Sequence, residues 1–185
     1  DDVMTELVNV LRSAVNTWEC DEMGHMNVRF YVTRSVDALA SFGQTIGLGP
    51  RVLRDNRQTL AMGEQHIRFL REIHPGTPFL ISAGVVSANE DQLTIYQELT
   101  NLVSGQVSAT FVVEARLADS TTRAPAQFSN TLIEQLQQQL IELPDHAKPR
   151  GISTAAPRTT PTIEEADTLG LFQIYQGIVN NTDTD

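Results

Sequence analysis

The sequence is poor in sulfur and in positive charge, and it has no long apolar run. Cys20 is its only cysteine, which excludes an internal disulfide and fits a reducing compartment. The net charge of −10 disfavours duplex nucleic acid and anionic membranes as partners, because both call for a basic face. No apolar run approaches the roughly 20 residues of a membrane span, and the first residues lack a signal peptide's basic and apolar regions. We therefore expect a cytoplasmic protein with no nucleic-acid or membrane partner.

Several motifs of hydrolase and cofactor sites are also missing. The chain has no glycine-rich phosphate loop and no Gly-x-Ser-x-Gly nucleophile motif, and its four histidines lack metal-ligand spacing. Cys20 adjoins Asp21, whose charge should raise the pKa of the thiol, so we interpret this cysteine as a buried small residue. These absences predict no metal, no bound cofactor and no cysteine nucleophile.

Apolar residues after Asn27 recur at the three-and-four spacing of an amphipathic helix. The pattern comprises Val28, Tyr31, Val32, Ser35, Val36, Leu39, Ala40, Phe42 and Ile46. Asn27 is suited to cap the start of this helix, and Gly47 with Gly49-Pro50 to end it. The spacing predicts a helix of about five turns.

Alternation of apolar and polar residues at 93–100 and 107–117, and a more continuous apolar run at 79–88, predict strands in the segments that follow. We expect strands at residues 59–70, 79–88, 93–99 and 107–117, a first strand at 12–18, and a further helix at 128–140. Successive hairpins imply an antiparallel sheet, and the long helix needs a sheet face to bury its apolar side. The fold class is therefore α+β, with a sheet of about five to six strands wrapped around one long central helix.

The C-terminal part of the chain differs in composition from the rest. Residues 144–161 are rich in Pro, Ser, Thr and Ala, which is typical of a linker. Residues 176–185 align without a gap on residues 12–21 and share Val, Asn and Asp at three positions. We interpret them as the opening strand of a second copy, with a plain edge strand as the alternative. The predicted division is residues 1–145 and 146–185, and the chain could be part of a double-domain protein.

The segment before the long helix combines groups that could act on a carbonyl. Asp21, His25 and Asn27 lie close in sequence, and the helix start has N–H groups without intrahelical partners. Such N–H groups could stabilise an oxyanion, while a nearby carboxylate attacks the carbonyl or activates water. The alternative is purely structural, because Asp and Asn before a helix are commonly caps and a lone His is commonly a hydrogen-bonded structural residue.

The segment Trp18-Glu-Cys-Asp-Glu-Met-Gly-His-Met-Asn27, followed by Tyr31, resembles the signature of 4-hydroxybenzoyl-CoA thioesterase-like hotdog proteins. Residues 66–72, Pro75-Gly76 and residues 104–111 are similar to the sheet of that family, so the likeness spans about residues 12–140. Glu19 stands where that family commonly has a second Asp. The resemblance implies the hotdog fold, hydrolysis of an acyl-CoA thioester, and pairing of hotdog units into a homo-oligomer.

The resemblance also implies roles for individual residues. Asp21 matches the catalytic carboxylate, as nucleophile or general base, and the backbone at Asn27 and Val28 matches the helix start that polarises the thioester carbonyl. His25 and Asn27 would orient substrate or water. The residues expected to line the substrate site are Gly24, Met26, Val28 and Tyr31.

Residues beyond the motif are further candidates for substrate binding. Glu64 and Arg68 share one face of a predicted strand and could approach the site, although a solvated strand face is the alternative. Arginines at 51, 54, 57, 68 and 71 could pair with the phosphates of coenzyme A.

Two other functions stay open at this stage. A hydratase or dehydratase acting on an acyl thioester could use His25 and Asp21 as a proton-transfer pair. A non-catalytic module could bind acyl-CoA without turnover.

Overall fold

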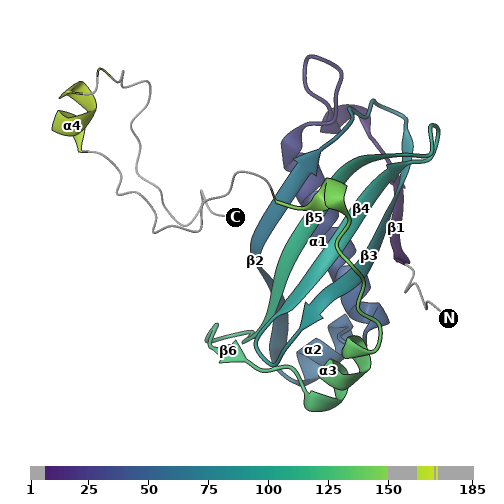
Figure 1. The fold of residues 1–185 in the computed structure, drawn as a ribbon, viewed down its shortest axis with the longest axis vertical. Helices are drawn as coiled ribbons and strands as arrows, with labels where there is room; N and C mark the ends of the chain where they lie inside the picture. The colour runs from purple at the N-terminus through teal and green to yellow at the C-terminus, as the bar shows by residue number, and fades with distance from the viewer. Residues whose placement is uncertain (1–6, 150–161, 169, 171–185) are drawn as a thin grey trace. The chain divides into compact units, whose positions relative to one another are not determined.

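The computed structural model describes residues 7–149, 162–168 and 170, which fall into two units, Asp1–Pro149 and Arg150–Asp185. The first unit holds all the strands of the described residues (Figure 1). Its strands are β1 (Val8–Ala14), β2 (Gln58–Phe69), β3 (Pro78–Ala88), β4 (Leu93–Asn101), β5 (Gln106–Asp119) and β6 (Pro125–Ala126). Its helices are η1 (Thr17–Glu19), α1 (Val28–Thr45), α2 (Pro50–Asp55), α3 (Asn130–Gln137) and η2 (Asp145–Ala147).

The strands form one antiparallel sheet in the order β1-β3-β4-β5-β2, with β6 paired to β5. Hairpins connect β3 to β4 and β4 to β5, as the alternating pattern predicts. Within this sheet β1 and β2 are the edge strands. The long β2 pairs with β5 except at a bulge between Met62 and Gln65.

The prediction of a first strand at residues 12–18 is wrong in its position. β1 ends at Ala14, and the residues before the motif form the 3-10 helix η1 instead. Asn16 and Glu19 make a capping box around η1, in which the Glu19 carboxylate accepts a hydrogen bond from Asn16 N at 2.7 Å. These reciprocal hydrogen bonds favour a tight turn over the extended pairing that the sequence pattern suggested.

Helix α1 begins where the sequence predicts, after Asn27, whose side chain accepts a hydrogen bond from Arg29 N at 3.0 Å. Its buried residues are Tyr31, Ser35, Ala38, Leu39, Phe42 and Gly43. This face packs against β1, β2 and β3, so α1 lies against one face of the sheet (Figure 1). The expectation of one long helix and a further helix at residues 128–140 is met only in part, because α3 spans the shorter range Asn130–Gln137 and the short helix α2, which begins at Pro50, was not expected.

Apolar side chains from the inner sheet face and α1 form the core. Those that are fully buried include Phe79, Ile81, Ile95, Leu99, Phe111 and Val113. Each such side chain contributes about 2 kcal/mol by leaving water. A buried polar bridge crosses this core, because Gln65 Nε2 donates to Ser35 Oγ at 2.7 Å and Ser35 Oγ donates to Gln97 Oε1. These hydrogen bonds give α1 one register on the sheet, since any shift would leave buried polar groups without partners.

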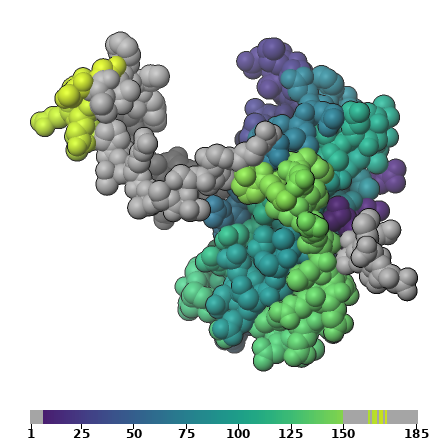
Figure 2. All heavy atoms as spheres, viewed as in Figure 1, coloured from purple at the N-terminus to yellow at the C-terminus, as the bar shows by residue number. Residues whose placement is uncertain are grey.

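The segment after α3 crosses the outer face of the sheet, where Figures 1 and 2 show it in green over the teal strands. Ile141 N donates to Val85 O at 2.8 Å, and Arg68 Nη1 donates to Asp145 O at 3.4 Å. Ala147 is fully buried, and His146 contacts the hydroxyl of Tyr96 at 3.2 Å. This segment therefore covers the face of the sheet opposite to α1.

The second unit holds the short helix α4 (Ile163–Thr168), which begins with a reciprocal pair of hydrogen bonds between Thr162 and Glu165. Most of the predicted linker and the whole segment that resembles a second opening strand, residues 176–185, lie outside the described residues. Their interpretation stays a prediction.

The six-stranded antiparallel sheet with α1 on one face is consistent with the hotdog fold expected from the resemblance. In the part of the chain that the structure describes, the helices fall short of the length and apolar character that crossing a membrane requires.

Candidate functional site

Asp21 closes a tight loop that ends at Asn27, which we call the motif loop (residues 20–27). Its Oδ1 accepts hydrogen bonds from Met23 N at 2.9 Å and from His25 N at 3.3 Å, and its own N–H donates to His25 O at 3.0 Å. Gly24 has a φ of +76°, a conformation that side chains rarely adopt. Asp21 therefore contacts the backbone of His25, and its carboxylate is held at a defined point of the loop.

Glu19 connects the motif loop to helix α1. Its side chain is almost fully buried, and Oε1 accepts a hydrogen bond from Arg34 Nη2 of α1 at 2.7 Å. Its backbone oxygen accepts a hydrogen bond from Asn27 N at 2.8 Å. Glu19 thus joins the motif loop to α1 through both its side chain and its backbone.

The start of α1 lies directly after this loop. The Asn27 side chain is used as the cap, and Val28 N–H donates to none of the described residues. Val28 is 56% exposed, so the start of α1 lies at the protein surface. An unpaired N–H at the positive end of a helix can polarise a carbonyl oxygen.

A cleft of about 700 Å³ opens beside the motif loop, and we call it the motif pocket. Its lining residues are His25, Met26, Val28, Tyr31, Phe69, Leu70, Arg71, Glu72 and His74. Tyr31 packs edge-on against Phe69 with 5.1 Å between ring centroids. The pocket therefore combines an aromatic wall with polar groups at its opening, as sites for small ligands commonly do.

Four residues of the pocket were not identified as site residues from the sequence: Phe69, Leu70, Glu72 and His74. Glu72 Oε2 lies 3.2 Å from His25 Nε2, and the His74 ring lies 5.1 Å from the His25 ring. Ile73 between them is fully buried, whereas Glu72 and His74 are exposed. The polar, apolar, polar order of Glu72, Ile73 and His74 could have indicated that the two polar side chains lie on the same side. Nothing in the sequence showed that the motif loop would lie next to them.

The spacing of histidines along the sequence did not indicate any metal-binding cluster. The structure nevertheless places one ligand atom each of His25, Glu72 and His74 within 4.8 Å of one another.

The pocket raises the pKa of its tyrosine. Burial, the neighbouring Cys20 and the charge of Glu72 together raise the pKa of Tyr31 to about 12. Its hydroxyl therefore stays protonated at neutral pH and can donate a hydrogen bond. Burial and the charges of Asp21 and Glu19 raise the pKa of the Cys20 thiol as well, although Cys20 is half-buried rather than buried. This shift disfavours a thiolate nucleophile.

The structure brings some of the predicted site residues together and places others elsewhere. His25, Met26, Val28 and Tyr31 line the motif pocket. Asp21, Gly24 and Asn27 belong to the motif loop but do not line the pocket. Glu64 and Arg68 do not line the pocket.

Two features of β2 explain the positions of Glu64 and Arg68. Glu64 is exposed in the bulge of β2. Arg68 alternates with Phe69 along the strand, and Phe69 faces α1. Arg68 accordingly lies on the outer sheet face, where it reaches Asp145 O.

The arginines suggested for coenzyme A differ in their surroundings. Arg51 and Arg54 form exposed ion pairs with Asp55, while Arg71 lines the motif pocket and donates to Val107 O at 2.9 Å. Arg71 is therefore the one of these three that lies beside the candidate site.

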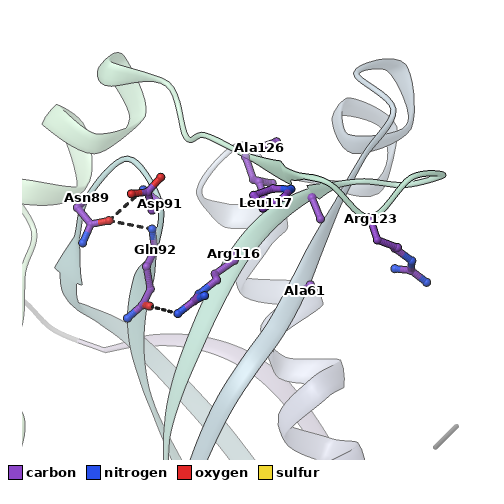
Figure 3. A pocket seen from close by; sticks show the side chains of 10 residues that line it. Ala61, Asn89, Asp91, Gln92, Arg116, Leu117, Arg123 and Ala126 are labelled. Carbon is purple, nitrogen blue, oxygen red and sulfur yellow. Dashed lines mark hydrogen bonds between the residues drawn. The ribbon is translucent and has the colours of Figure 1, made fainter.

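A second cleft of about 640 Å³ lies at the other end of β2 (Figure 3). Ala61 lines this cleft and Phe69 the motif pocket, a separation of roughly 26 Å along an extended strand. Arg116 is directed to Gln92, its hydrogen-bond partner at 2.8 Å (Figure 3). Asp91 is the only carboxylate in the lining, which contains no His, Cys or Tyr. The second cleft thus lacks a nucleophile and base pair, and the acid–base groups gather at the motif pocket.

Comparison with solved structures supports the architecture. A Staphylococcus aureus protein in complex with CoA is 21% identical, with a TM-score of 0.69 over 85% of this chain and 99% of that one. The DHNA-CoA thioesterase of the same organism is 13% identical, with a TM-score of 0.64 over 69% of this chain and 89% of that one. The 1,4-dihydroxy-2-naphthoyl-CoA thioesterase of Synechocystis is 17% identical, with a TM-score of 0.58 over 69% and 96%. At these identities the likeness shows the fold alone.

Sequence comparison gives the family. No curated protein matches the chain. The profile of the Thioesterase-like superfamily matches residues 15–140, a span that contains the motif loop, α1 and the strands from β2 to β5. The chain therefore belongs to the Thioesterase-like superfamily.

Proposed function

We propose that the protein is a cytoplasmic homodimer that hydrolyses an acyl-CoA thioester at the motif pocket. The observation that carries this proposal is the start of α1, where Val28 lines the motif pocket, its N–H donates to none of the described residues, and the preceding loop holds Asp21. A thioester carbonyl that accepts a hydrogen bond from Val28 N–H becomes more electrophilic, and the same N–H group stabilises the oxyanion that forms on attack. Family membership supports the reaction class.

Asp21 does not itself line the pocket, but its carboxylate accepts a hydrogen bond from the N–H of His25, which does, and in this mechanism it acts as the base or the nucleophile. As a base, it takes a proton from water while the hydroxide oxygen forms a bond to the carbonyl carbon; the C–S bond then breaks and the CoA thiolate leaves. As a nucleophile, its carboxylate attacks the carbonyl carbon, the C–S bond breaks and the CoA thiolate leaves; water then hydrolyses the resulting mixed anhydride, which releases the free acid and regenerates the Asp21 carboxylate. The hydroxyl of Tyr31 and the imidazole of His25 line the same pocket and would orient the substrate.

The pocket also suggests where the two ends of the substrate lie. Tyr31, Phe69 and Met26 provide apolar surface for an acyl group, and Arg71 lies at the pocket where a CoA phosphate could pair with it. Glu64 and Arg68 lie apart from this pocket, so a role for either in binding would require the pocket of a second copy.

The decisive experiment measures free-thiol release from a panel of acyl-CoAs by the wild type and by Asp21→Asn. Asparagine keeps the oxygen that accepts hydrogen bonds from Met23 N and His25 N, so the loop should stay folded. We expect the rate to fall by about 10²- to 10⁴-fold, the usual contribution of a positioned acid or base. The control Glu22→Gln changes the exposed neighbour and should leave the rate unchanged. Equal rates for wild type and Asp21→Asn would refute the role of Asp21.

One observation keeps hydration of an acyl thioester as a second candidate. The imidazole of His25 has a carboxylate partner, Glu72 at 3.2 Å, which is the kind of pair that hydratases use for proton transfer. Conversion of crotonyl-CoA to its 3-hydroxy product without thiol release would favour this reaction. Saturable acyl-CoA binding without any turnover would instead favour a binding module.

We expect a second copy of the chain to pack against the exposed face of α1. Val28, Val32 and Val36 form an exposed apolar stripe on α1 at the four-residue spacing of one helix face, and Phe69 on the edge strand β2 is 50% exposed. Apolar exposure of this kind next to a sheet edge is typical of an interface. Light scattering should show a dimer, and Val32→Glu should shift it toward monomer by burying a charge.

A further inference from the structure

Two imidazoles and one carboxylate surround a single point at the opening of the motif pocket. One ligand atom each of His25, Glu72 and His74 lies within 4.8 Å of the others, and His25 Nε2 lies 3.2 Å from Glu72 Oε2. We propose that these three side chains bind one divalent transition-metal ion of the Zn²⁺ class. The proposal is independent of thioester hydrolysis.

The backbone holds the ligand-bearing segments in a fixed relation to each other. Met26 N donates to Ile73 O at 2.9 Å, which ties the end of the motif loop to the segment between Glu72 and His74. Ile73 is fully buried in the core and fixes the direction of its two neighbours. The three ligands are thus positioned by the fold, and binding an ion requires only rotation of side chains.

The hydrogen bond of His74 prepares it as a ligand. Its Nδ1 lies 3.0 Å from Gly24 O, and a carbonyl oxygen can only accept, so Nδ1 carries the proton. The lone pair of the neutral ring is then on Nε2. Histidines that bind metals usually donate the other ring N–H to a carbonyl or carboxylate in this way, which fixes the tautomer and the ring orientation.

The donor set determines the class of ion. Two imidazole nitrogens and one carboxylate oxygen suit Zn²⁺, Co²⁺ or Ni²⁺, whereas Mg²⁺ and Ca²⁺ prefer oxygen ligands alone. Three protein ligands leave a coordination position for water or for an anionic ligand in the pocket. The net charge of −10 also favours accumulation of cations near the protein.

A structural alternative predicts different behaviour. If His25 and Glu72 form only an ion pair, then His74 serves only to hold Gly24, and removing His74 should not affect metal binding. If the three residues form a metal site, then His74 and Glu72 each contribute a bond, and removal of either weakens binding.

The experiment titrates the chelator-stripped, full-length chain with Zn²⁺ by calorimetry and with Co²⁺ by visible absorption. We expect one ion per chain, with affinity about tenfold or more weaker in His74→Ala and in Glu72→Gln. His146→Ala is the matched control, because His146 also pairs with a carboxylate, Glu98 at 3.4 Å, on the outer sheet face. This control should bind like the wild type, and millimolar Mg²⁺ should not displace the ion.

Either of two results would overturn the proposal: absence of saturable binding by the wild type, or unchanged affinity in His74→Ala. Glu72 and His74 are both exposed, so the two substitutions should leave the fold intact, which circular dichroism checks. No substrate is present in the titration, so its outcome does not depend on whether the protein hydrolyses thioesters.

Discussion

The carboxylate of Glu19 and the guanidinium of Arg34 form an ion pair of 2.7 Å beneath the motif loop, with side chains only 4% and 18% exposed. Glu19 also accepts hydrogen bonds from Asn16. Removing the Arg34 cation would leave the buried Glu19 carboxylate with only these neutral donors, which stabilise its charge less than the guanidinium does. Arg34→Met should lower the free energy of unfolding by about 3 kcal/mol, measured by urea denaturation. The matched control Arg51→Met breaks an exposed pair with Asp55 and should cost less than about 1 kcal/mol. Equal losses in the two variants would contradict a buried ion pair.

Gly24 tests the geometry of the motif loop. Its φ of +76° is unfavourable for a side chain, yet a Cβ at this position would meet no atom within 4 Å, so the cost of a substitution comes from the backbone alone. Gly24→Ala should destabilise the protein by about 1–2 kcal/mol, and Gly24→Asn by less, because Asn tolerates this conformation. Thermal unfolding of both variants gives the order of their stabilities. An alanine variant as stable as the asparagine variant would argue against a left-handed Gly24.

Tyr31 makes stability depend on alkaline pH. The pKa of the folded state, about 12, lies above the ordinary value of 10, so the stabilisation is complete below pH 10 and is lost as the pH rises to about 12. Two pKa units correspond to a loss of up to about 3 kcal/mol over this range. Tyr31→Phe lacks the ionising hydroxyl, so its free energy of unfolding should fall less between these two pH values than that of the wild type. Urea unfolding at both pH values measures the difference. Parallel losses in both proteins would show that burial does not hold the phenol neutral.

Metal addition links the two proposals. An ion bound by His25, Glu72 and His74 would occupy the opening of the motif pocket, so Zn²⁺ should inhibit hydrolysis by the wild type, and a chelator should restore it. Inhibition should require more Zn²⁺ in His74→Ala than in the control His146→Ala. An inhibition curve that is the same in both variants would place the inhibiting ion elsewhere.

The sequence by itself determined much of the local structure. The three-and-four spacing of apolar residues predicted α1, and Asn27 marked its start because an unpaired helix start needs a capping acceptor. Alternation predicted β4 and β5 within a few residues, since one face of each strand is buried, and a more continuous apolar run predicted β3. The position of β1 could not be predicted, because the capping box of Asn16 and Glu19 outweighed the weak alternation around it.

Only the tertiary structure decided which residues meet at the pocket. His25, Met26, Val28 and Tyr31 were expected at the site because the motif resembles that of a thioesterase family, and all four line the pocket. Glu72 and His74 come to the same place through the pairing of Met26 with Ile73, a contact between segments nearly fifty residues apart. Glu64 and Arg68 were placed correctly on a strand, but the bulge and the face of β2 direct them away from the pocket. Local spacing specifies helices, caps and strands, whereas the packing of distant segments decides which side chains share a site.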